Sequence, residues 1–125
     1  MPIIAKMTLV ANNIPAMVTY YNAVLDAGFE PIPGAPDGFH RGQIAGIETL
    51  LCPNHIAQVE AKQNRQQFDF IVDDITLTMH TALDTGAQII EAIREQDGIQ
   101  TASVYDPDGN SMVFIQKVTS SEEAI

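Results

Sequence analysis

The sequence contains the same order of secondary-structure signals twice, and this duplication constrains the fold more than any other feature. Each copy opens with a short strand-like segment, at residues 7–10 and 68–72. An Asn or Asp residue suited to cap a helix follows in both copies, and an apolar stripe at helical spacing comes next. The stripes end at Gly28 and Gly86, where we expect the two helices to terminate.

Three further strand-like segments follow each of these glycines. The first copy has them at 29–32, 39–44 and 47–52, and the second at 87–94, 99–105 and 111–118. Each copy is therefore predicted to be a β-α-β-β-β module, and the fold class is α+β. We expect a single domain at 1–118, with module one at 1–53, a linker at 54–66, module two at 67–118, and a flexible acidic tail at 119–125.

Two local motifs give this duplicated pattern a family resemblance. Residues 106–110 read Asp-Pro-Asp-Gly-Asn, which predicts a tight turn in which Pro107 fixes φ and Gly109 adopts positive φ. Residues 20–29 read Tyr-Tyr-Asn-Ala-Val-Leu-Asp-Ala-Gly-Phe. At these places in a duplicated chain, the motifs resemble the vicinal oxygen chelate superfamily, which includes glyoxalase I, bleomycin-resistance proteins, fosfomycin-resistance enzymes and ring-cleaving dioxygenases. The resemblance extends to about Val118 and implies a curved mixed sheet that forms a cup.

Strand alternation separates the side chains that pack under the helices from those that line the cup. Met7, Leu9, Phe68, Phe70 and Val72 are predicted to lie under the helices. The phase of the last strand, which is apolar on both faces, is taken from the resemblance. The candidate ligand-binding residues are Lys6, Thr8, Glu48, Leu50, Cys52, Gln67, Asp69, Ser103, Tyr105, Ser111 and Val113, with Val10, Ile71 and Ile115 as additional apolar wall.

In metal-dependent relatives, the resemblance implies four ligand positions. Here they fall on Lys6, Gln67, Val113 and, depending on the alignment, either Glu48 or Leu50. A cationic Lys6 repels a divalent ion, and Val113 has no donor atom. We therefore predict no metal and no cofactor, and no catalytic residue is assigned.

The remaining chemically active side chains are interpreted as structural. His40, His55 and His80 have no spacing that would bring two rings together on one metal. Cys52 has no histidine or helix N-terminus predicted beside it, so we interpret it as a small hydrophobe.

Composition excludes several classes of partner. The 125 residues are 46% hydrophobic, enough for an ordinary core, and the 16 acidic residues outnumber the 6 basic ones. Phosphate backbones and anionic lipids are repelled by such a chain, so nucleic acid and membranes are not expected partners. A single cysteine forms no internal disulfide, residues 1–4 do not resemble a signal peptide, and a cytoplasmic location is expected.

Two classes of function fit this sequence. The first is a small-molecule binding protein, resembling bleomycin-resistance proteins, with a metal-free cup at a homodimer interface near residues 62–66. Because Glu48 and Asp69 outnumber Lys6 in the cup, its ligand is expected to be neutral or cationic. The second is a glyoxalase-like lyase or dioxygenase, with ligands at other positions or with Glu48 or Asp69 as acid and base. Lys6 and Val113 favour the first class. Whether the two modules pair within one chain or between two chains is left open.

Overall fold

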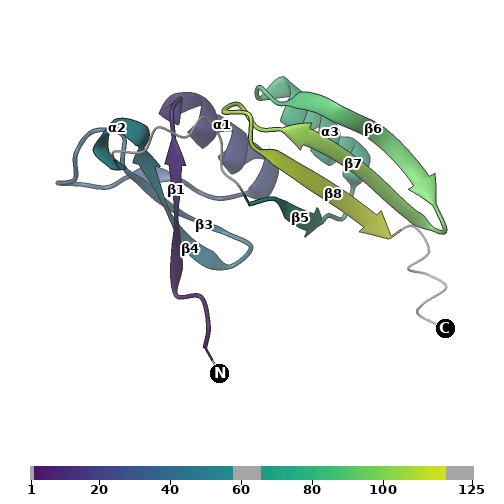
Figure 1. Cartoon of the computed structure of the whole chain (residues 1–125), viewed down its shortest axis with the longest axis horizontal. Coiled ribbons are helices and arrows are strands. Elements are labelled where there is room, and N and C mark those ends of the chain that lie inside the picture. Colours follow the sequence, from purple (N-terminus) through teal and green to yellow (C-terminus); the bar gives the residue numbers. More distant parts are fainter. Residues whose placement is uncertain (1, 58–65, 118–125) are drawn as a thin grey trace.

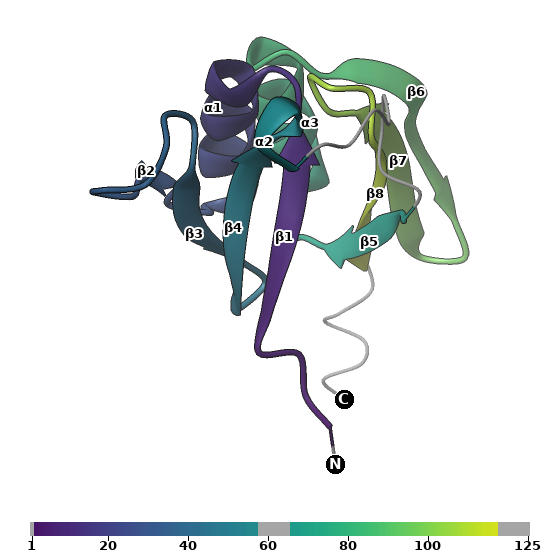
Figure 2. The same ribbon diagram turned by 60° about the vertical axis from the view of Figure 1, so that its left-hand side comes forward.

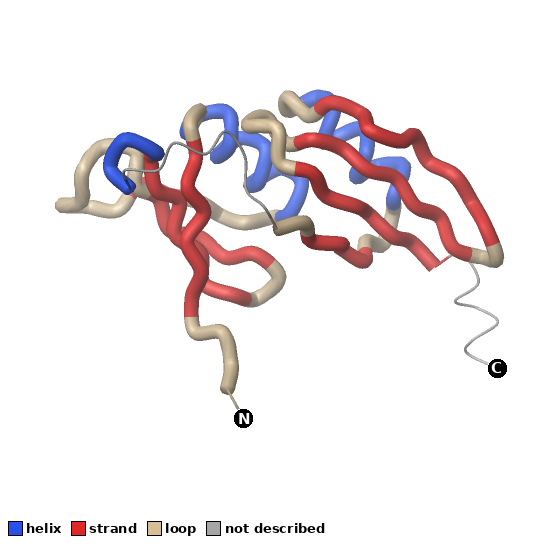
Figure 3. Tube along the Cα trace, in the orientation of Figure 1, coloured by secondary structure: helices blue, strands red, loops and turns tan. Residues whose placement is uncertain are grey.

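The computed structural model describes residues 2–57 and 66–117. The first module contains β1 (Lys6–Ala11), α1 (Ile14–Leu25), β2 (Glu30–Pro31), β3 (His40–Ile44) and β4 (Ile47–Pro53). The second contains β5 (Phe68–Ile71), α3 (Ile75–Asp84), β6 (Gln88–Gln96), β7 (Ile99–Tyr105) and β8 (Ser111–Lys117), and a short α2 (Asn54–Ala57) follows β4. The predicted β-α-β-β-β order and the α+β class are confirmed (Figure 3). No helix in the described ranges is long and apolar enough to cross a membrane.

The two modules form two four-stranded sheets with the same topology. The strand orders are β1-β4-β3-β2 and β5-β8-β7-β6, and in each sheet the first and last strands of the module pair in parallel. The other pairs are antiparallel. Figures 1 and 2 show the two sheets side by side, with α1 and α3 together on one side of the pair, where the two helices contact each other.

Both helices begin as the sequence predicts, but only one ends there. The side chain of Asn13 accepts a hydrogen bond from the backbone of α1, which satisfies one of the free N–H groups at the helix start. Helix α1 ends at Leu25, and Asp26 takes the left-handed conformation at φ 52°, so the predicted stop at Gly28 is wrong by two positions. Asp tolerates this conformation because its short polar side chain bonds locally. In the second module Gly86 follows the helix end at φ 107°, as expected.

One hydrophobic core joins the two modules. On the sheets, Thr49 and Leu51 of β4 are fully buried, and so are Val104 of β7 and Phe114 of β8. The helices contribute the buried side chains Ile14, Met17, Tyr20, Tyr21, Ile75, Met79 and Ala82. Because these side chains belong to a single cluster, α1 and α3 are enclosed between the inner faces of the two sheets.

The turn before β8 has the predicted local chemistry. Gly109 adopts φ 92°, a conformation that suits a residue without Cβ. One carboxylate oxygen of Asp106 accepts hydrogen bonds from the backbone N–H groups of Asp108 and Asn110, both at 2.9 Å. Asp106 is 2% exposed, so these bonds replace the water that the carboxylate loses on burial.

The same turn also connects the second module to the first. The Tyr21 hydroxyl of α1 donates to the second oxygen of Asp106 at 2.7 Å. The carboxylate of Asp108 accepts from the backbone N–H groups of Asn12 at 2.8 Å and Asn13 at 3.0 Å, just before α1. The start and the middle of the first helix are therefore anchored to the β7–β8 turn.

Candidate functional site

The register of the first sheet places several candidate residues on one surface, which we call face A. Lys6 of β1 lies opposite Glu48 of β4, and Thr8 lies opposite Leu50. Thr49 and Leu51, which alternate with Glu48 and Leu50 along β4, are buried under the helices. Face A is therefore the side of the sheet that points away from the helices. Arg41 of β3 pairs with Leu50 and therefore joins face A.

The corresponding surface of the second sheet, face B, contains the candidate residues of β5, β7 and β8. Asp69 lies opposite Val113, which in turn lies opposite Ser103. The Ser111 hydroxyl donates to the side-chain oxygen Oε1 of Gln67 at 2.9 Å, and the side-chain Nε2 of Gln67 donates to the Asp69 carboxylate at 3.3 Å. A chain of hydrogen bonds thus runs from Ser111 through Gln67 to the Asp69 carboxylate on face B.

Face B also has a shallow cavity whose charged residues the sequence analysis missed. Its volume is about 190 Å³, and its lining includes Glu91, Arg94, Ser103 and Val113. Arg94 and Glu91 form an ion pair at 3.9 Å with largely exposed side chains, so the pair adds little stability. Strand β6 was recognised as a strand, but its register shifts between Ile89 and Arg94 prevent simple alternation from assigning its faces.

Exposure varies among the candidates: Ser103 and Cys52 are buried, whereas Tyr105 is exposed. Tyr105 pairs with Ser111 at one end of face B and is 39% exposed. Cys52 pairs with Val10 on the side of face A, but its side chain is only 5% exposed, and α2 contacts both strands beside it. Burial raises the pKa of the Cys52 thiol, and a hydrogen bond with the backbone of Ala57 opposes this in part. A protonated, covered thiol is a poor nucleophile.

Faces A and B do not enclose a common cup within one chain. The inner faces of both sheets pack on the same helical core, so faces A and B lie on the outer sides of their sheets. Lys6, Glu48 and Asp69 are accordingly exposed.

The internal repeat decides which β4 residue corresponds to Val113. Val113 pairs with Asp69, and Thr8 stands as far before the cap of α1 as Asp69 stands before the cap of α3. Thr8 pairs with Leu50, so Leu50 is the counterpart of Val113. The repeat therefore places Leu50, rather than Glu48, at the fourth-strand ligand position.

The resulting donor set does not fit a divalent metal. Lys6, Leu50, Gln67 and Val113 offer one ammonium group, one amide and two hydrocarbon side chains, whereas such ions require imidazole, carboxylate or thiolate ligands. Within residues 2–57 and 66–117, no three His, Cys, Asp or Glu side chains gather closely enough to hold a metal ion.

Comparison with known proteins identifies the family. Residues 6–115 match the family described as glyoxalase-like domain. No curated protein matches the chain.

Solved structures with the same fold cover nearly the whole chain. A hypothetical protein from S. aureus is 16% identical, with a TM-score of 0.73 over 93% of this chain and 95% of that one. A glyoxalase/bleomycin resistance protein/dioxygenase family enzyme from Burkholderia phytofirmans is 19% identical, with a TM-score of 0.71 over 93% and 99%. The fosfomycin resistance protein FosX from Mesorhizobium loti is 14% identical, with a TM-score of 0.71 over 98% of each chain. With its duplicated module, its sheet topology and this family match, the chain belongs to the glyoxalase-like domain family and thus to the vicinal oxygen chelate superfamily.

Proposed function

We propose that the protein is a cytoplasmic small-molecule binding protein that holds its ligand without a metal, in cups made by face A of one chain and face B of a second copy. The observation that carries the proposal is the donor set at the metal positions, where Leu50 and Val113 have no ligand atoms and Lys6 is a cation. A site of this composition can hold an organic molecule but cannot activate it through a bound metal ion.

The assembly into a homodimer is supported by the apolar groups on the open faces. On face B, Ile71 is 72% exposed and Ile99 is 40% exposed, while Val113 and Ile115 are half-buried. Pairing with a second copy would remove this apolar surface from water and would give two equivalent cups. Residues 62–65, expected near the junction, lie outside the described part of the chain. Light scattering should give a dimer mass, and a monomer at high micromolar concentration would contradict the proposal.

The ligand class follows from the side chains of the two faces. Lys6 was expected to be the single cation of the cup, and this is corrected because the register adds Arg41, Arg94 and Lys117. The carboxylates of the two faces are Glu30, Glu48, Asp69 and Glu91. The two faces therefore have no local acidic excess, and the net charge of −10 is the reason to favour a neutral or cationic amphipathic molecule.

The names of two neighbours support a drug-like ligand. FosX is a fosfomycin resistance protein, and the Burkholderia neighbour has bleomycin resistance in its family name. We therefore propose sequestration of a drug-like molecule. A thermal-shift screen of neutral and cationic antibiotics tests this, because a ligand that binds only the folded protein raises its melting temperature.

Complementation between two variants tests the shared cup. Leu50→Trp obstructs face A and Val113→Trp obstructs face B, so each variant alone should lose binding of an antibiotic found in the screen. In a mixed dimer, one cup would combine the two unaltered faces, and half of the sites should recover. If each cup were instead built within one chain, no mixture would recover binding. Leu77→Trp, at an exposed position on α3, is the matched control.

The alternative is a metal-independent lyase or dioxygenase-like enzyme of the same superfamily. The hydrogen-bond chain from Ser111 through Gln67 to Asp69 favours it, since it orients a carboxylate that could accept a proton. In this case an organic molecule that binds would be converted to a product that mass spectrometry detects, and Asp69→Asn would abolish conversion while retaining binding. Recovery of unchanged ligand supports the binding protein.

A further inference from the structure

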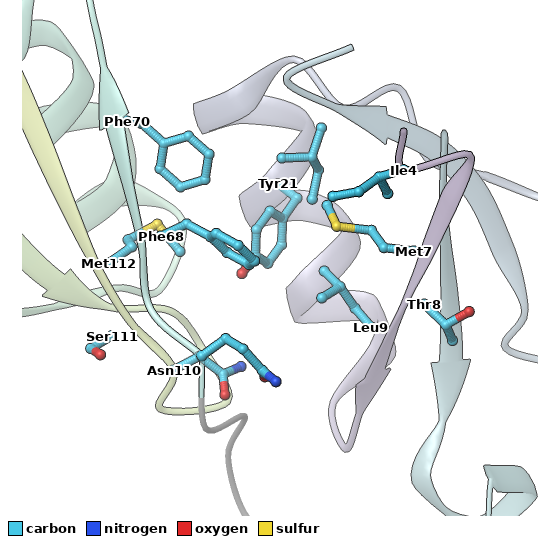
Figure 4. A pocket seen from close by; sticks show the side chains of 12 residues that line it. Ile4, Met7, Thr8, Leu9, Tyr21, Phe68, Phe70, Asn110, Ser111 and Met112 are labelled. Atoms are coloured by element: carbon cyan, nitrogen blue, oxygen red, sulfur yellow. The ribbon is translucent and has the colours of Figure 1, made fainter. Parts of the chain in front are cut away.

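A second cavity lies between the two modules, on the side of the strands that faces the shared core. Its volume is about 300 Å³, within the lower part of the range for small-molecule sites. Figure 4 shows Met7 and Leu9 of β1 on one side, Phe68 and Phe70 of β5 on the other, and Tyr21 of α1 between them. Within each strand these four residues alternate with those of faces A and B, so the cavity lies mainly on the inner side of the strands. Its lining also includes Thr8 and Ser111, so it adjoins both faces at its edge.

The lining of this inter-module cavity has no charged side chain. Its one titratable group is Tyr21, whose pKa is raised well above the usual value by burial and then by the negative charge of Asp106. The hydroxyl of Tyr21 is already bonded to that carboxylate. An ion would find no counter-charge in the cavity and would lose its hydration, so charged molecules are excluded.

The shape of the apolar wall favours an aromatic ligand. The rings of Phe68 and Phe70 lie 6.4 Å apart at an interplanar angle of 54°, which leaves ring faces and edges available to a third ring. Phe68 is 49% exposed, so it stands at the opening of the cavity. Asn110 and Ser111 lie together on the opposite side from Phe70 in Figure 4, and they provide a polar end.

We propose that the inter-module cavity is a second binding site, for an uncharged and mainly aromatic small molecule with at most one polar substituent. The substituent would lie toward Asn110 and Ser111, and the ring system between β1 and β5. A bound molecule would contact both modules at once and would stabilise their packing. This site adjoins the cups through Thr8 and Ser111, but its apolar wall lies on the opposite side of the strands, and its ligand differs from theirs because it must be uncharged.

Binding of N-phenyl-1-naphthylamine, a neutral fluorescent probe, tests the proposal on the full chain. The wild type should bind the probe saturably with enhanced fluorescence. Phe68→Ser removes one aromatic wall and should weaken binding at least about threefold, the value expected for loss of one aromatic pair. Met7→Trp fills the cavity from β1 and should abolish binding. Far-UV circular dichroism confirms that each variant is folded.

Ile71→Ser is the matched control, because it removes an apolar side chain from the same strand on the opposite face. It should leave probe affinity unchanged, and an effect equal to that of Phe68→Ser would place the probe on face B and overturn the proposal. Absence of saturable binding would overturn it too. A probe affinity that falls as the protein concentration rises would also overturn the proposal, because a second copy of the chain would then cover the cavity. Leu50→Trp separates the two proposals, because it obstructs a cup and should leave probe binding intact.

Discussion

Replacing Tyr21 by Phe tests the connection between the two modules. The Tyr21 hydroxyl is buried and donates to the Asp106 carboxylate at 2.7 Å, across a sequence separation of 85 residues. The substitution removes only the hydroxyl and keeps the ring, which packs edge-on against Phe29 at a centroid distance of 6.4 Å. The loss therefore reports on this hydrogen bond rather than on ring packing.

The cost follows from the charge and the burial of the acceptor. Hydrogen bonds to charged groups contribute about 1.5–3 kcal/mol to stability. The lower half of this range is the better expectation, because Asp106 keeps its bonds to the backbone of Asp108 and to Asn110. Urea denaturation should show a decrease in the free energy of unfolding of about 2 kcal/mol, with an unchanged m-value.

The other two tyrosines provide the comparison. Tyr20 is buried, but its hydroxyl faces the weaker acceptor sulfur of Met112 at 3.1 Å, so Tyr20→Phe should cost less than Tyr21→Phe. Tyr105 is 39% exposed, and Tyr105→Phe should change stability by less than about 0.5 kcal/mol. If Tyr21→Phe proves no more destabilising than Tyr105→Phe, the bond to Asp106 does not anchor α1.

Three further predictions concern stability. Asp108→Ala leaves two backbone N–H groups before α1 without their acceptor and should cost about 1 kcal/mol in urea, whereas no measurable loss would contradict the anchoring role. Gly42→Ala places a Cβ 2.5 Å from the carbonyl oxygen of Ala27, and we expect a loss of about 1–3 kcal/mol by thermal denaturation; a neutral effect would contradict the close approach of these segments. The pKa values of Tyr20 and Tyr21 are raised by burial and by the charge of Asp106, so the free energy of unfolding should decrease as pH rises above about 10. As pH rises, the absorbance of ionised tyrosine and the loss of circular dichroism that reports unfolding should therefore appear together. Ionisation of the buried tyrosines while the protein remains folded would contradict this.

Local patterns predict the modules because each signal is short-range. Helical spacing, strand alternation and the turn at residues 106–110 all concern neighbours in the sequence, and the structure has them where they are expected. The end of α1 was placed two residues late because the helix already ends before Asp26, which adopts positive φ as Gly28 does. A rule that favours glycine selects Gly28 and misses Asp26.

The arrangement of the two modules depends on contacts that no short pattern contains. The turn sequence at residues 106–110 does not indicate that the Asp108 carboxylate accepts hydrogen bonds from Asn12 and Asn13 in the other module. Alternation separated inner from outer faces, but it did not indicate that both inner faces share one helical core. The cavity between the modules follows from that packing.

Metal content is the most direct test of the central claim that the cup functions without a metal. Protein purified without chelator would be incubated separately with Ni²⁺, Zn²⁺, Mn²⁺ and Fe²⁺, desalted, and analysed by plasma mass spectrometry. Because Lys6, Leu50, Gln67 and Val113 occupy the ligand positions, each metal should remain far below one ion per chain. Stoichiometric binding of any of these metals, lost in Glu48→Gln or Gln67→Ala, would contradict the account.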